Sequence, residues 1–302
     1  MIEKVTLQNF RCFPWLQVPL KPLTVLIGPN DSGKSAFLAA IRNIGTGHLA
    51  TGRTDFWRYD ESALPAFDLQ FSHRGEQIAH CSPIEIFQLP STGITMESSG
   101  RDDSIGPPPL GAIGDGTANV YDYLLRRDRP RFFAALEALK SLIPGFEDLR
   151  IGTPSAQTRD VIYSTEHGFE IRAQQASTGV RFLTAFVALA YHPNPPGTIL
   201  IEEPETGVHP KRLGDIVRLL REVTEGKHGA RKAQVIITTH SPYLLDCIDL
   251  DLDQILVFRR QSDGSRTAVP ADKDRLKAFL DEFMLGEVWY NQGEEGLVAK
   301  PS

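Results

Sequence analysis

The residues most suggestive of chemistry run from Gly28 to Ser35, read GPNDSGKS and match the pattern G-x-x-x-x-G-K-S. Glycines let backbone N–H groups wrap phosphate oxygens, and a helix that follows turns its positive end toward them. Lys34 would reach the β- and γ-phosphates of a nucleotide, and the Ser35 hydroxyl would bind Mg²⁺. An apolar run precedes this segment and a helical pattern follows it, as the motif requires. The predicted nucleotide-binding loop comprises Gly28, Pro29, Asn30, Asp31, Ser32, Gly33, Lys34, Ser35 and Ala36.

Two adjacent acids end a second apolar run, ILIEEPE, at Glu202 and Glu203. Neighbouring side chains point to opposite sides of a strand, so one carboxylate can serve Mg²⁺ and the other an attacking water. An acidic strand end beside a helix N-terminus is the alternative interpretation. Because a phosphate-binding motif is present in the same chain, we predict Glu202 at the metal and Glu203 as the base.

His240 follows a third apolar run in QVIITTHSP. The carboxyl ends of parallel strands are where ligands bind in open α/β sheets, so His240 would hydrogen-bond the γ-phosphate and orient the water. A histidine satisfied within a turn is the alternative. Its place at the end of the buried strand after Glu203 favours the catalytic interpretation.

Ser177-Thr178-Gly179 precedes another helical pattern. Serine is a good helix N-cap, which is the structural interpretation. A hydroxyl, a glycine amide and a helix N-terminus also form an anion site, which is the functional one. Two phosphate-binding helix starts with a single glycine-rich loop predict a composite site built from Ser177 and Gly179 of one subunit and the loop of another.

The elements that position these residues follow from hydrophobic periodicity. Strand patterns ending at Gly28, Glu202 and Thr238, with helical patterns between them, favour an α/β fold with a mostly parallel sheet. The chain between them alternates apolar and polar residues over about 67–96 and 148–173, is rich in Gly, Pro, Ser and Asp over 97–118, and has a helical stripe over 132–143. We therefore expect an antiparallel β subdomain and an inserted helical lobe beside the parallel sheet.

Composition limits the function classes. The 302 residues are 41% hydrophobic and 23% charged with a net charge of −6, which is typical of a globular protein and argues against disorder, coiled-coil arms and bulk polyanion binding. The three cysteines lie far apart, which indicates a reducing cytoplasm. The uncharged stretch 182–201 is broken by Pro193, Pro195 and Pro196, so we expect no membrane span and no membrane partner.

The order of these motifs resembles that of the ABC-type ATPase superfamily, and more narrowly the AAA-type ATPases of the RecF, SMC and OLD branch. The segments TLQNFRCF, ILIEEPETGVHP, VIITTHSPYLLD and MLGEVWYNQG are similar to blocks of that family. The resemblance covers nearly the whole chain, with a looser fit at 50–118. It implies a P-loop NTPase fold in a single ATPase domain over 1–302, with a core of 1–49 and 165–302 and an inserted lobe of about 50–164.

The resemblance also implies a head-to-tail homodimer that sandwiches two ATP molecules with Mg²⁺. Glu203 then corresponds to the catalytic base, His240 to the switch histidine, and Glu202 stands where the family often has Asp. The STGVR signature departs from the usual S-D-G-T at Thr178 and Val180. Arg11 would approach the nucleotide base, and Gln70 and Gln88 are both candidates for the family's Gln loop.

The function predicted from these features is a soluble ATP-driven switch that acts with a partner protein in DNA repair or anti-phage defence. Alternatives are a transporter nucleotide-binding subunit, for which an LSGGQ-type signature is lacking, the ATPase subunit of a two-component nuclease, and a small-molecule kinase. A fused nuclease would use acids such as Asp249, Asp251 and Asp253, which read better as an exposed acidic face. The basic run from Arg126 to Arg131 is a candidate DNA contact, with solvated surface as its alternative.

Overall fold

The computed structural model describes residues 1–46, 57–59, 65–71, 86–89, 96, 98–99, 106–111, 114–155, 158–228, 231–280 and 283–298. The chain divides into two compact units, which are described separately. The first comprises 1–86, 197–203 and 234–302, and the second comprises 87–196 and 204–233. The strands of the first unit are therefore contributed by three separate stretches of chain.

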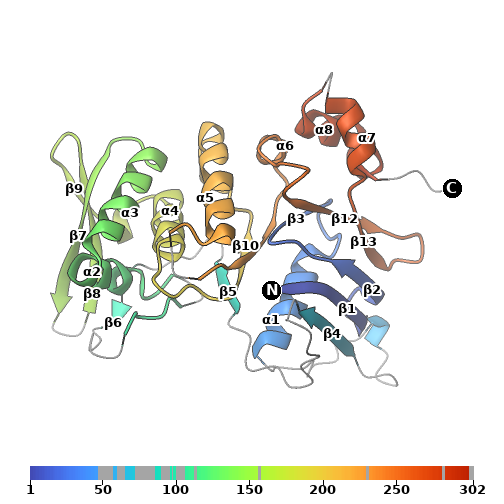
Figure 1. Cartoon of the computed structure of the whole chain (residues 1–302), viewed down its shortest axis with the longest axis horizontal. Helices are drawn as coiled ribbons and strands as arrows, with labels where there is room; N and C mark the ends of the chain where they lie inside the picture. The colour runs from blue at the N-terminus through green and yellow to red at the C-terminus, as the bar shows by residue number, and fades with distance from the viewer. Residues whose placement is uncertain are drawn as a thin grey trace. The chain divides into compact units, whose positions relative to one another are not determined.

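A small antiparallel sheet begins the first unit, with strand order β2-β1-β4 (Figure 1). Residues on β2 alternate between buried and exposed, as expected of a sheet with one face on a core. The turn between β1 and β2 carries Arg11 and Cys12. Its strands are β1 (Ile2–Phe10), β2 (Phe13–Pro19) and β4 (Ala66–Phe71).

The larger sheet has the order β13-β12-β3-β11-β10-β5, and the unit boundary falls within β5. Strands β12, β3, β11 and β10 pair in parallel, and β13 pairs with β12 in the antiparallel sense. All five residues of both β3 and β11 are buried, which explains their predominantly apolar sequences. The strands are β3 (Leu23–Ile27), β5 (Ile86–Leu89), β10 (Thr198–Glu202), β11 (Gln234–Thr238), β12 (Gln254–Arg260) and β13 (Arg266–Pro270).

The register of the parallel strands brings their carboxyl ends together. Thr238 of β11 aligns with Glu202 of β10 on one side and with Leu26 of β3 on the other. The residues that follow these strands, from Gly28 and from Glu203, therefore emerge at one edge of the sheet.

Helix α1 (Lys34–Thr46) starts at the end of the loop after β3 and packs into a core shared with both sheets. Phe37 of this helix contacts Phe258 of β12 edge-to-face, with ring centroids 5.5 Å apart, and Phe13 of β2 lies 6.3 Å from the same ring. This apolar packing fixes the start of α1 against the sheet. The unit also contains α6 (Pro242–Leu245), α7 (Lys273–Leu280), α8 (Leu285–Leu297) and the 3₁₀ turn Trp57–Tyr59.

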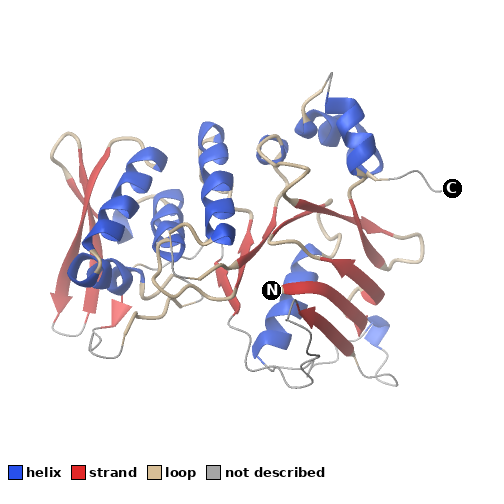
Figure 2. Ribbon diagram, in the orientation of Figure 1, coloured by secondary structure: helices blue, strands red, loops and turns tan. Residues whose placement is uncertain are grey.

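The second unit combines helices with an antiparallel sheet of order β6-β8-β7, to which β9 adds beside β8 (Figure 2). Two buried tyrosines join its helices and sheet, because Tyr121 donates to Thr184 O at 2.9 Å and Tyr163 to Thr184 Oγ1 at 3.1 Å. Its elements are α2 (Thr117–Arg127), α3 (Arg129–Leu142), α4 (Thr178–Ala190), α5 (Leu213–Glu225), β6 (Ser98–Ser99), β7 (Phe146–Ser155), β8 (Thr158–Thr165), β9 (Glu170–Arg172) and the 3₁₀ turns Ala173–Gln175 and Pro210–Arg212.

The division into units differs from the core and insertion expected from the sequence. Residues 165–196 and 204–233, expected in the core, group with the second unit because α4 and α5 pack with each other and with α3, and α4 also packs on α2. Much of the expected β-rich segment 67–96 and of the connector 97–118 lies outside the described residues. The parallel strands ending at Ile27, Glu202 and Thr238 lie where the sequence predicts them.

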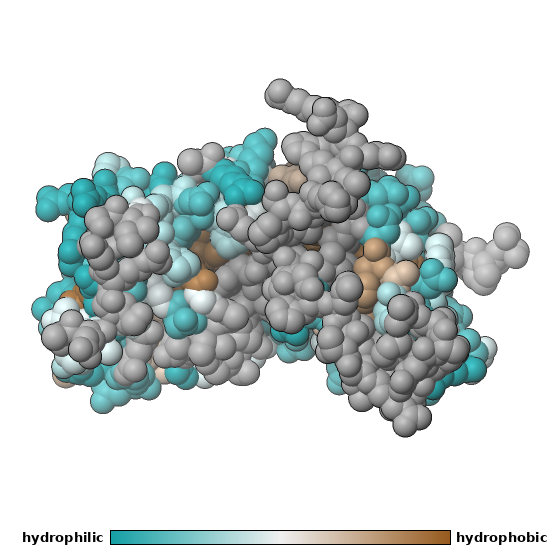
Figure 3. All heavy atoms as spheres, turned by 90° about the horizontal axis from the view of Figure 1, so that it is seen from below, coloured by the Kyte–Doolittle hydropathy of each residue, from teal (hydrophilic) through white to brown (hydrophobic). Residues whose placement is uncertain are grey.

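Among the described residues, none of the helices has the length and apolar character needed to cross a membrane. On the face drawn in Figure 3, the described surface is mainly hydrophilic, with small hydrophobic patches.

A buried glutamine ties the two sheets of the first unit together. Gln234, at the start of β11, has no exposed surface and accepts from Ile2 N at 2.9 Å. Its amide nitrogen donates to Ile2 O at 2.7 Å and Lys21 O at 3.2 Å. One side chain thus satisfies backbone groups of β1 and of the turn before β3.

Gln234→Leu keeps the side-chain size but removes these hydrogen bonds, which leaves buried backbone groups without partners. We expect the free energy of unfolding to fall by about 1–3 kcal/mol, measured by urea denaturation. Gln17→Leu is the matched control, since Gln17 is exposed on β2 and its amide nitrogen donates to Thr6 Oγ1 of β1. Equal effects of the two substitutions would contradict the role given to Gln234.

Candidate functional site

The loop from Gly28 to Ser35 joins β3 to α1 along a path that requires its glycines. Gly28 has φ +147°, and a Cβ there would lie 2.4 Å from the carbonyl oxygen of Phe258. Gly33 has φ +101°, and its Cβ would lie 2.8 Å from Cζ of Phe13. Since neither position accepts a side chain, the glycine spacing of the sequence motif is a steric requirement of this loop.

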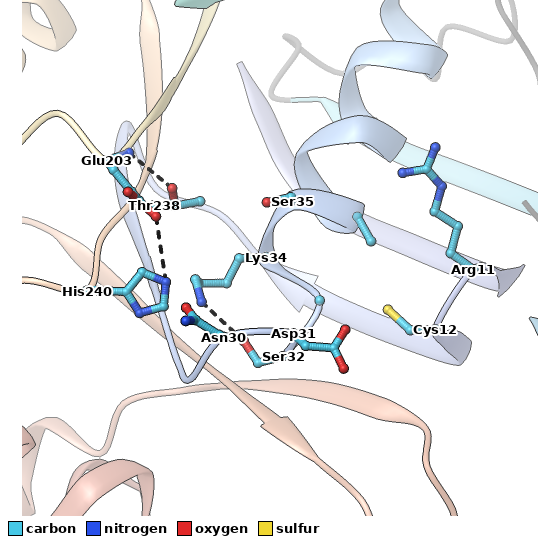
Figure 4. A pocket seen from close by; sticks show the side chains of 12 residues that line it. Arg11, Cys12, Asn30, Asp31, Ser32, Lys34, Ser35, Glu203, Thr238 and His240 are labelled. Atoms are coloured by element: carbon cyan, nitrogen blue, oxygen red, sulfur yellow. Dashed lines mark hydrogen bonds and ion pairs between the residues drawn. The ribbon is translucent and has the colours of Figure 1, made fainter. Parts of the chain in front are cut away.

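Lys34 reaches back from the first turn of α1 into the loop. Its side chain is almost fully buried, and Nζ donates to the carbonyl oxygens of Gly28 at 2.7 Å and Pro29 at 2.9 Å. Ser32 Oγ lies 3.4 Å from Nζ (Figure 4). Burial lowers the pKa of Lys34 to about 8, although the carboxylate of Glu203 acts in the opposite direction. The loop therefore surrounds a positive charge that gives up its proton more readily than an exposed lysine.

A pocket of about 580 Å³ opens over this loop (Figure 4). Every residue that lines it belongs to the first unit, so the site needs no contribution from the second to form. The lining residues are Arg11, Cys12, Asn30, Asp31, Ser32, Gly33, Lys34, Ser35, Ala36, Glu203, Thr238 and His240.

Glu203 and His240 face each other across the wall of the pocket formed by β10 and β11. Glu203 N donates to Thr238 O at 3.0 Å and is 3.2 Å from Thr238 Oγ1, which fixes the backbone directly after β10. Glu203 also has φ +46°, a conformation that costs a non-glycine residue energy and that is found most often at functional sites. Its Oε1 lies 3.8 Å from His240 Nε2 (Figure 4).

Partial burial and the nearby Lys34 ammonium lower the pKa of His240, while Glu203 opposes the shift. The imidazole is therefore mainly neutral at pH 7, with one nitrogen that donates and one that accepts. A neutral ring beside a carboxylate can hold and orient a water or a phosphate oxygen.

The donor set fits a polyphosphate with a magnesium ion. Glycine-shaped backbone and the Lys34 ammonium suit phosphate oxygens, and the exposed Ser35 hydroxyl lines the same pocket. No group of three or more His, Cys, Asp or Glu side chains suited to a metal occurs among the residues that the structure describes. A metal ion here would need phosphate oxygens and water as additional ligands, which is the mode that Mg²⁺ favours.

Of the other residues predicted from the sequence, some line the pocket or its loop and some do not. Arg11, with φ +49° on the β1–β2 turn, lines the pocket, and Gly28 and Pro29 form the start of the loop. Glu202 ends β10 but is not among the lining residues.

Ser177 and Gly179 belong to the second unit. Ser177 Oγ accepts from Val180 N at 3.3 Å and caps α4, so its structural interpretation is confirmed. A Cβ on Gly179 would lie 2.1 Å from the carbonyl oxygen of Gly207 in the same unit, which restricts this position to glycine.

Three residues of the site were not predicted from the sequence: Cys12, Thr238 and Arg266. Cys12 and Thr238 are neighbours of motif residues and could have been found as the rest of the turn and the last residue of β11. Arg266 bonds Asp31 from β13, and no sequence pattern connects positions so far apart in the chain.

The acids of the β11–β12 connection stabilise their own turn. Asp249 Oδ1 accepts from Asp251 N and Leu252 N, Asp253 Oδ2 accepts from Asp249 N, and Asp251 pairs with Lys277 at 2.5 Å. These bonds explain the acidic run by turn geometry and surface pairing.

In the basic run, Arg126 pairs with Asp122 of the same helix at 2.9 Å, and Arg131 pairs at 3.4 Å with Asp128, the N-cap residue of its helix. Gln70 lies on β4, and Gln88 lies on β5.

Comparisons with known proteins cover the whole site. Residues 1–50 match the family described as "AAA ATPase domain", and residues 108–246 match "AAA domain, putative AbiEii toxin, Type IV TA system". An OLD nuclease from Thermus scotoductus is 23% identical over 380 residues, covering 99% of this chain and 70% of that protein.

Solved structures show the same fold. An SMC head bound to the C-terminal winged-helix domain of ScpA superposes with a TM-score of 0.62 at 16% identity, over 92% of this chain and 99% of that one. The SMC head domain from Thermotoga maritima gives 0.52 at 17% identity, over 90% and 99%. Together the two family matches, the OLD relative and the SMC heads support an AAA or ABC-type ATPase of the RecF, SMC and OLD branch.

These matches confirm the family resemblance and the P-loop NTPase fold predicted from the sequence. The match over 1–50 includes the Gly28–Ser35 loop, and the match over 108–246 includes the residues from Ser177 to His240. The pocket is accordingly the place to seek its nucleotide.

The lowered pKa of Lys34 predicts how nucleotide binding depends on pH. Phosphate needs the ammonium form, which is fully present well below pH 8 and is lost from the free protein as the pH rises through about 8. Because bound phosphates hold the proton on Lys34, the Kd for ATP should rise above pH 8, approaching about tenfold per pH unit. Titrations with a fluorescent ATP analogue between pH 6.5 and 9.5 measure this dependence.

Lys34→Arg is the control, since its guanidinium keeps its charge over the whole range. Its affinity, whatever its absolute value, should vary less with pH than that of the wild type. A wild-type Kd that stays constant up to pH 9.5 would contradict the pKa assigned to Lys34.

Proposed function

We propose that this protein binds and hydrolyses ATP and acts as a conformational switch. The observation that carries the proposal is the pocket in which Lys34 and Ser35 of the loop lie with Glu203 and His240 of two neighbouring strand ends. One wall supplies phosphate ligands and the other supplies a carboxylate beside a neutral imidazole, which is the combination that phosphoryl transfer to water requires.

In the proposed reaction the loop amides and Lys34 bind the phosphates. Ser35 with Glu202 would hold Mg²⁺, which would supply positive charge to offset the charge that develops on the phosphates. Glu203 accepts a proton from the attacking water, and His240 orients that water or hydrogen-bonds the γ-phosphate. Glu203 is the better candidate for the base because it lines the pocket beside His240, while Glu202 ends β10. Arg11 approaches the nucleotide base from the β1–β2 turn.

The proposed active form is a head-to-tail homodimer, in which Ser177 and Gly179 of each subunit complete the ATP site of the other. The start of α4 supports this arrangement, because a capped helix N-terminus with a glycine offers backbone N–H groups to an anion. ATP bound between two subunits stabilises the closed dimer, and hydrolysis releases it, which is how the nucleotide would shift the population of conformations.

The proposed biological role is DNA repair or anti-phage defence in the cytoplasm, together with a protein effector. Support comes from the relative described as an OLD nuclease, from the family description that includes "putative AbiEii toxin", and from the SMC head bound to a ScpA domain. DNA is a further candidate partner. An ATPase subunit of a two-component nuclease system fits the OLD relative and is the second candidate function, and a transporter subunit has less support.

Substitutions in the two walls of the pocket should separate binding from hydrolysis. Lys34→Ala removes the buried cation and should abolish ATP binding. Glu203→Gln keeps a side chain of the same size but cannot accept the proton, so it should retain ATP and slow turnover by about 100-fold or more. Equilibrium binding and phosphate release measure the two effects, and hydrolysis by Glu203→Gln at the wild-type rate would contradict its assignment as base.

The dimer predicts complementation between two inactive variants. Ser177→Arg keeps its own loop but blocks the partner's site, while Lys34→Ala loses its loop but keeps an intact Ser177. A mixed dimer of the two contains one complete site, so ATPase activity should appear when the inactive variants are combined. Mixing two batches of Lys34→Ala is the control, and a mixture that stays inactive although the variants associate would contradict the composite site.

A further inference from the structure

Arg266 bonds two segments that line the pocket, the Gly28–Ser35 loop and the β1–β2 turn. It opens β13 and is 7% exposed. Its Nε donates to Asp31 O at 2.6 Å, and its Nη2 donates to Asp31 Oδ2 at 2.6 Å. Its backbone N–H donates to Cys12 O at 2.9 Å, and its Nη1 bonds Gly264 O. A single buried residue therefore holds both the Gly28–Ser35 loop and the β1–β2 turn.

The Asp31 position needs such support for a conformational reason. Asp31 has φ +60°, so a residue with a side chain occupies left-handed backbone in the middle of the loop. Aspartate tolerates this conformation better than most residues but still pays a cost relative to glycine. The bond from Arg266 Nε to Asp31 O restrains the peptide group at this position, and with it the direction of the neighbouring N–H groups.

Charge gives a second reason. The Asp31 carboxylate is largely exposed, lines the pocket and is carried by the loop that, as proposed, binds the phosphates. Figure 4 shows it directed toward the Cys12 side, away from Lys34. A free carboxylate there would repel a triphosphate, whereas the guanidinium of Arg266 neutralises it and holds it against the wall.

We propose that Arg266 is a positioning residue for the nucleotide phosphates, which fixes the backbone of the loop at Asp31 and neutralises the carboxylate of Asp31. The inference rests on the proposed function of the pocket as a triphosphate site. It assigns the β12–β13 hairpin, which contributes no residue to the pocket lining, a part in nucleotide affinity.

A purely structural role for Arg266 is the competing explanation, since a buried arginine also joins the hairpin to the rest of the unit. The two explanations differ in what happens when the carboxylate is removed. If Arg266 has only a structural role, adding Asp31→Asn to an Arg266 variant would not restore its ATP affinity. If the loss of affinity comes from repulsion between the Asp31 carboxylate and the phosphates, adding Asp31→Asn would restore it.

The experiment is a double-mutant cycle on ATP affinity and ATPase kinetics. Arg266→Gln should weaken ATP binding by about tenfold or more, because it leaves Asp31 charged and its carbonyl oxygen unrestrained. In the Asp31→Asn background the same substitution should weaken ATP binding much less, so the double variant should bind close to Asp31→Asn alone. In Arg266→Gln the KM for ATP should rise while kcat changes little. The loss of binding affinity should be smaller for AMP than for ATP.

Arg260→Gln is the matched control, because Arg260 is the register partner of Arg266 on β12 and is exposed. It should bind ATP like the wild type. Arg266→Lys keeps the charge without the two-pronged geometry, so its affinity should lie between those of the wild type and Arg266→Gln. This variant supplies the same comparison if Arg266→Gln does not fold.

The outcomes separate this inference from the proposed function. If the wild type does not bind ATP, both are overturned. If the wild type binds ATP and loses it in Lys34→Ala, but Arg266→Gln and Arg266→Lys bind normally, only the role of Arg266 is overturned. A double variant that folds yet binds as weakly as Arg266→Gln overturns the neutralisation of Asp31 by Arg266, because the carboxylate would then not be the cause of the defect.

Discussion

The candidate site depends on the register of buried parallel strands. Because β3, β11 and β10 are hydrogen-bonded side by side, with Thr238 aligned to both Leu26 and Glu202, their carboxyl ends cannot separate without breaking the sheet. The loop after Ile27 and the acid after Glu202 are thus brought together by backbone pairing, although the sequence separates them widely. The polar groups of the pocket can adopt strained or buried states because this apolar framework holds them.

Two energetic costs are concentrated at the edge of that framework. Lys34 gives up most of its hydration and regains hydrogen bonds to groups of its own loop, and Glu203 keeps a left-handed backbone held by Thr238. Neither arrangement is favourable by itself, since burial weakens the hold of Lys34 on its proton and positive φ strains a glutamate. An anionic ligand would repay the first cost, so the site is better suited to a bound phosphate than to its own isolated charge.

Sequence reasoning reached the motif residues and the parallel strands because both are local patterns. A glycine whose Cβ has no room, an acid after a buried strand and a helix that starts at Lys34 each leave a signature within a few residues. It did not reach Arg266, whose contact with Asp31 exists only after β13 has paired with β12. The core implied by the family resemblance includes α4 and α5, whereas in the structure these helices pack with α3 in the second unit, a grouping that depends on which apolar faces meet after folding.

The difference between local patterns and contacts formed on folding also bears on Ser177-Thr178-Gly179, for which the sequence allows a structural and a functional interpretation. The N-cap bond of Ser177 accounts for the serine, and the carbonyl oxygen of Gly207 accounts for the glycine, so local structure alone requires both residues. Yet Gly207 lies only a few positions after Glu203, and the boundary between the two units falls directly after that acid. The short segment that packs on the start of α4 is therefore the continuation of the strand that presents the proposed base. A substitution at Gly179 would press on this segment, and loss of activity there would not by itself establish contact with a nucleotide. The complementation of separate subunits is the stronger criterion, because it depends on which chain supplies Ser177 and not on how that chain is packed.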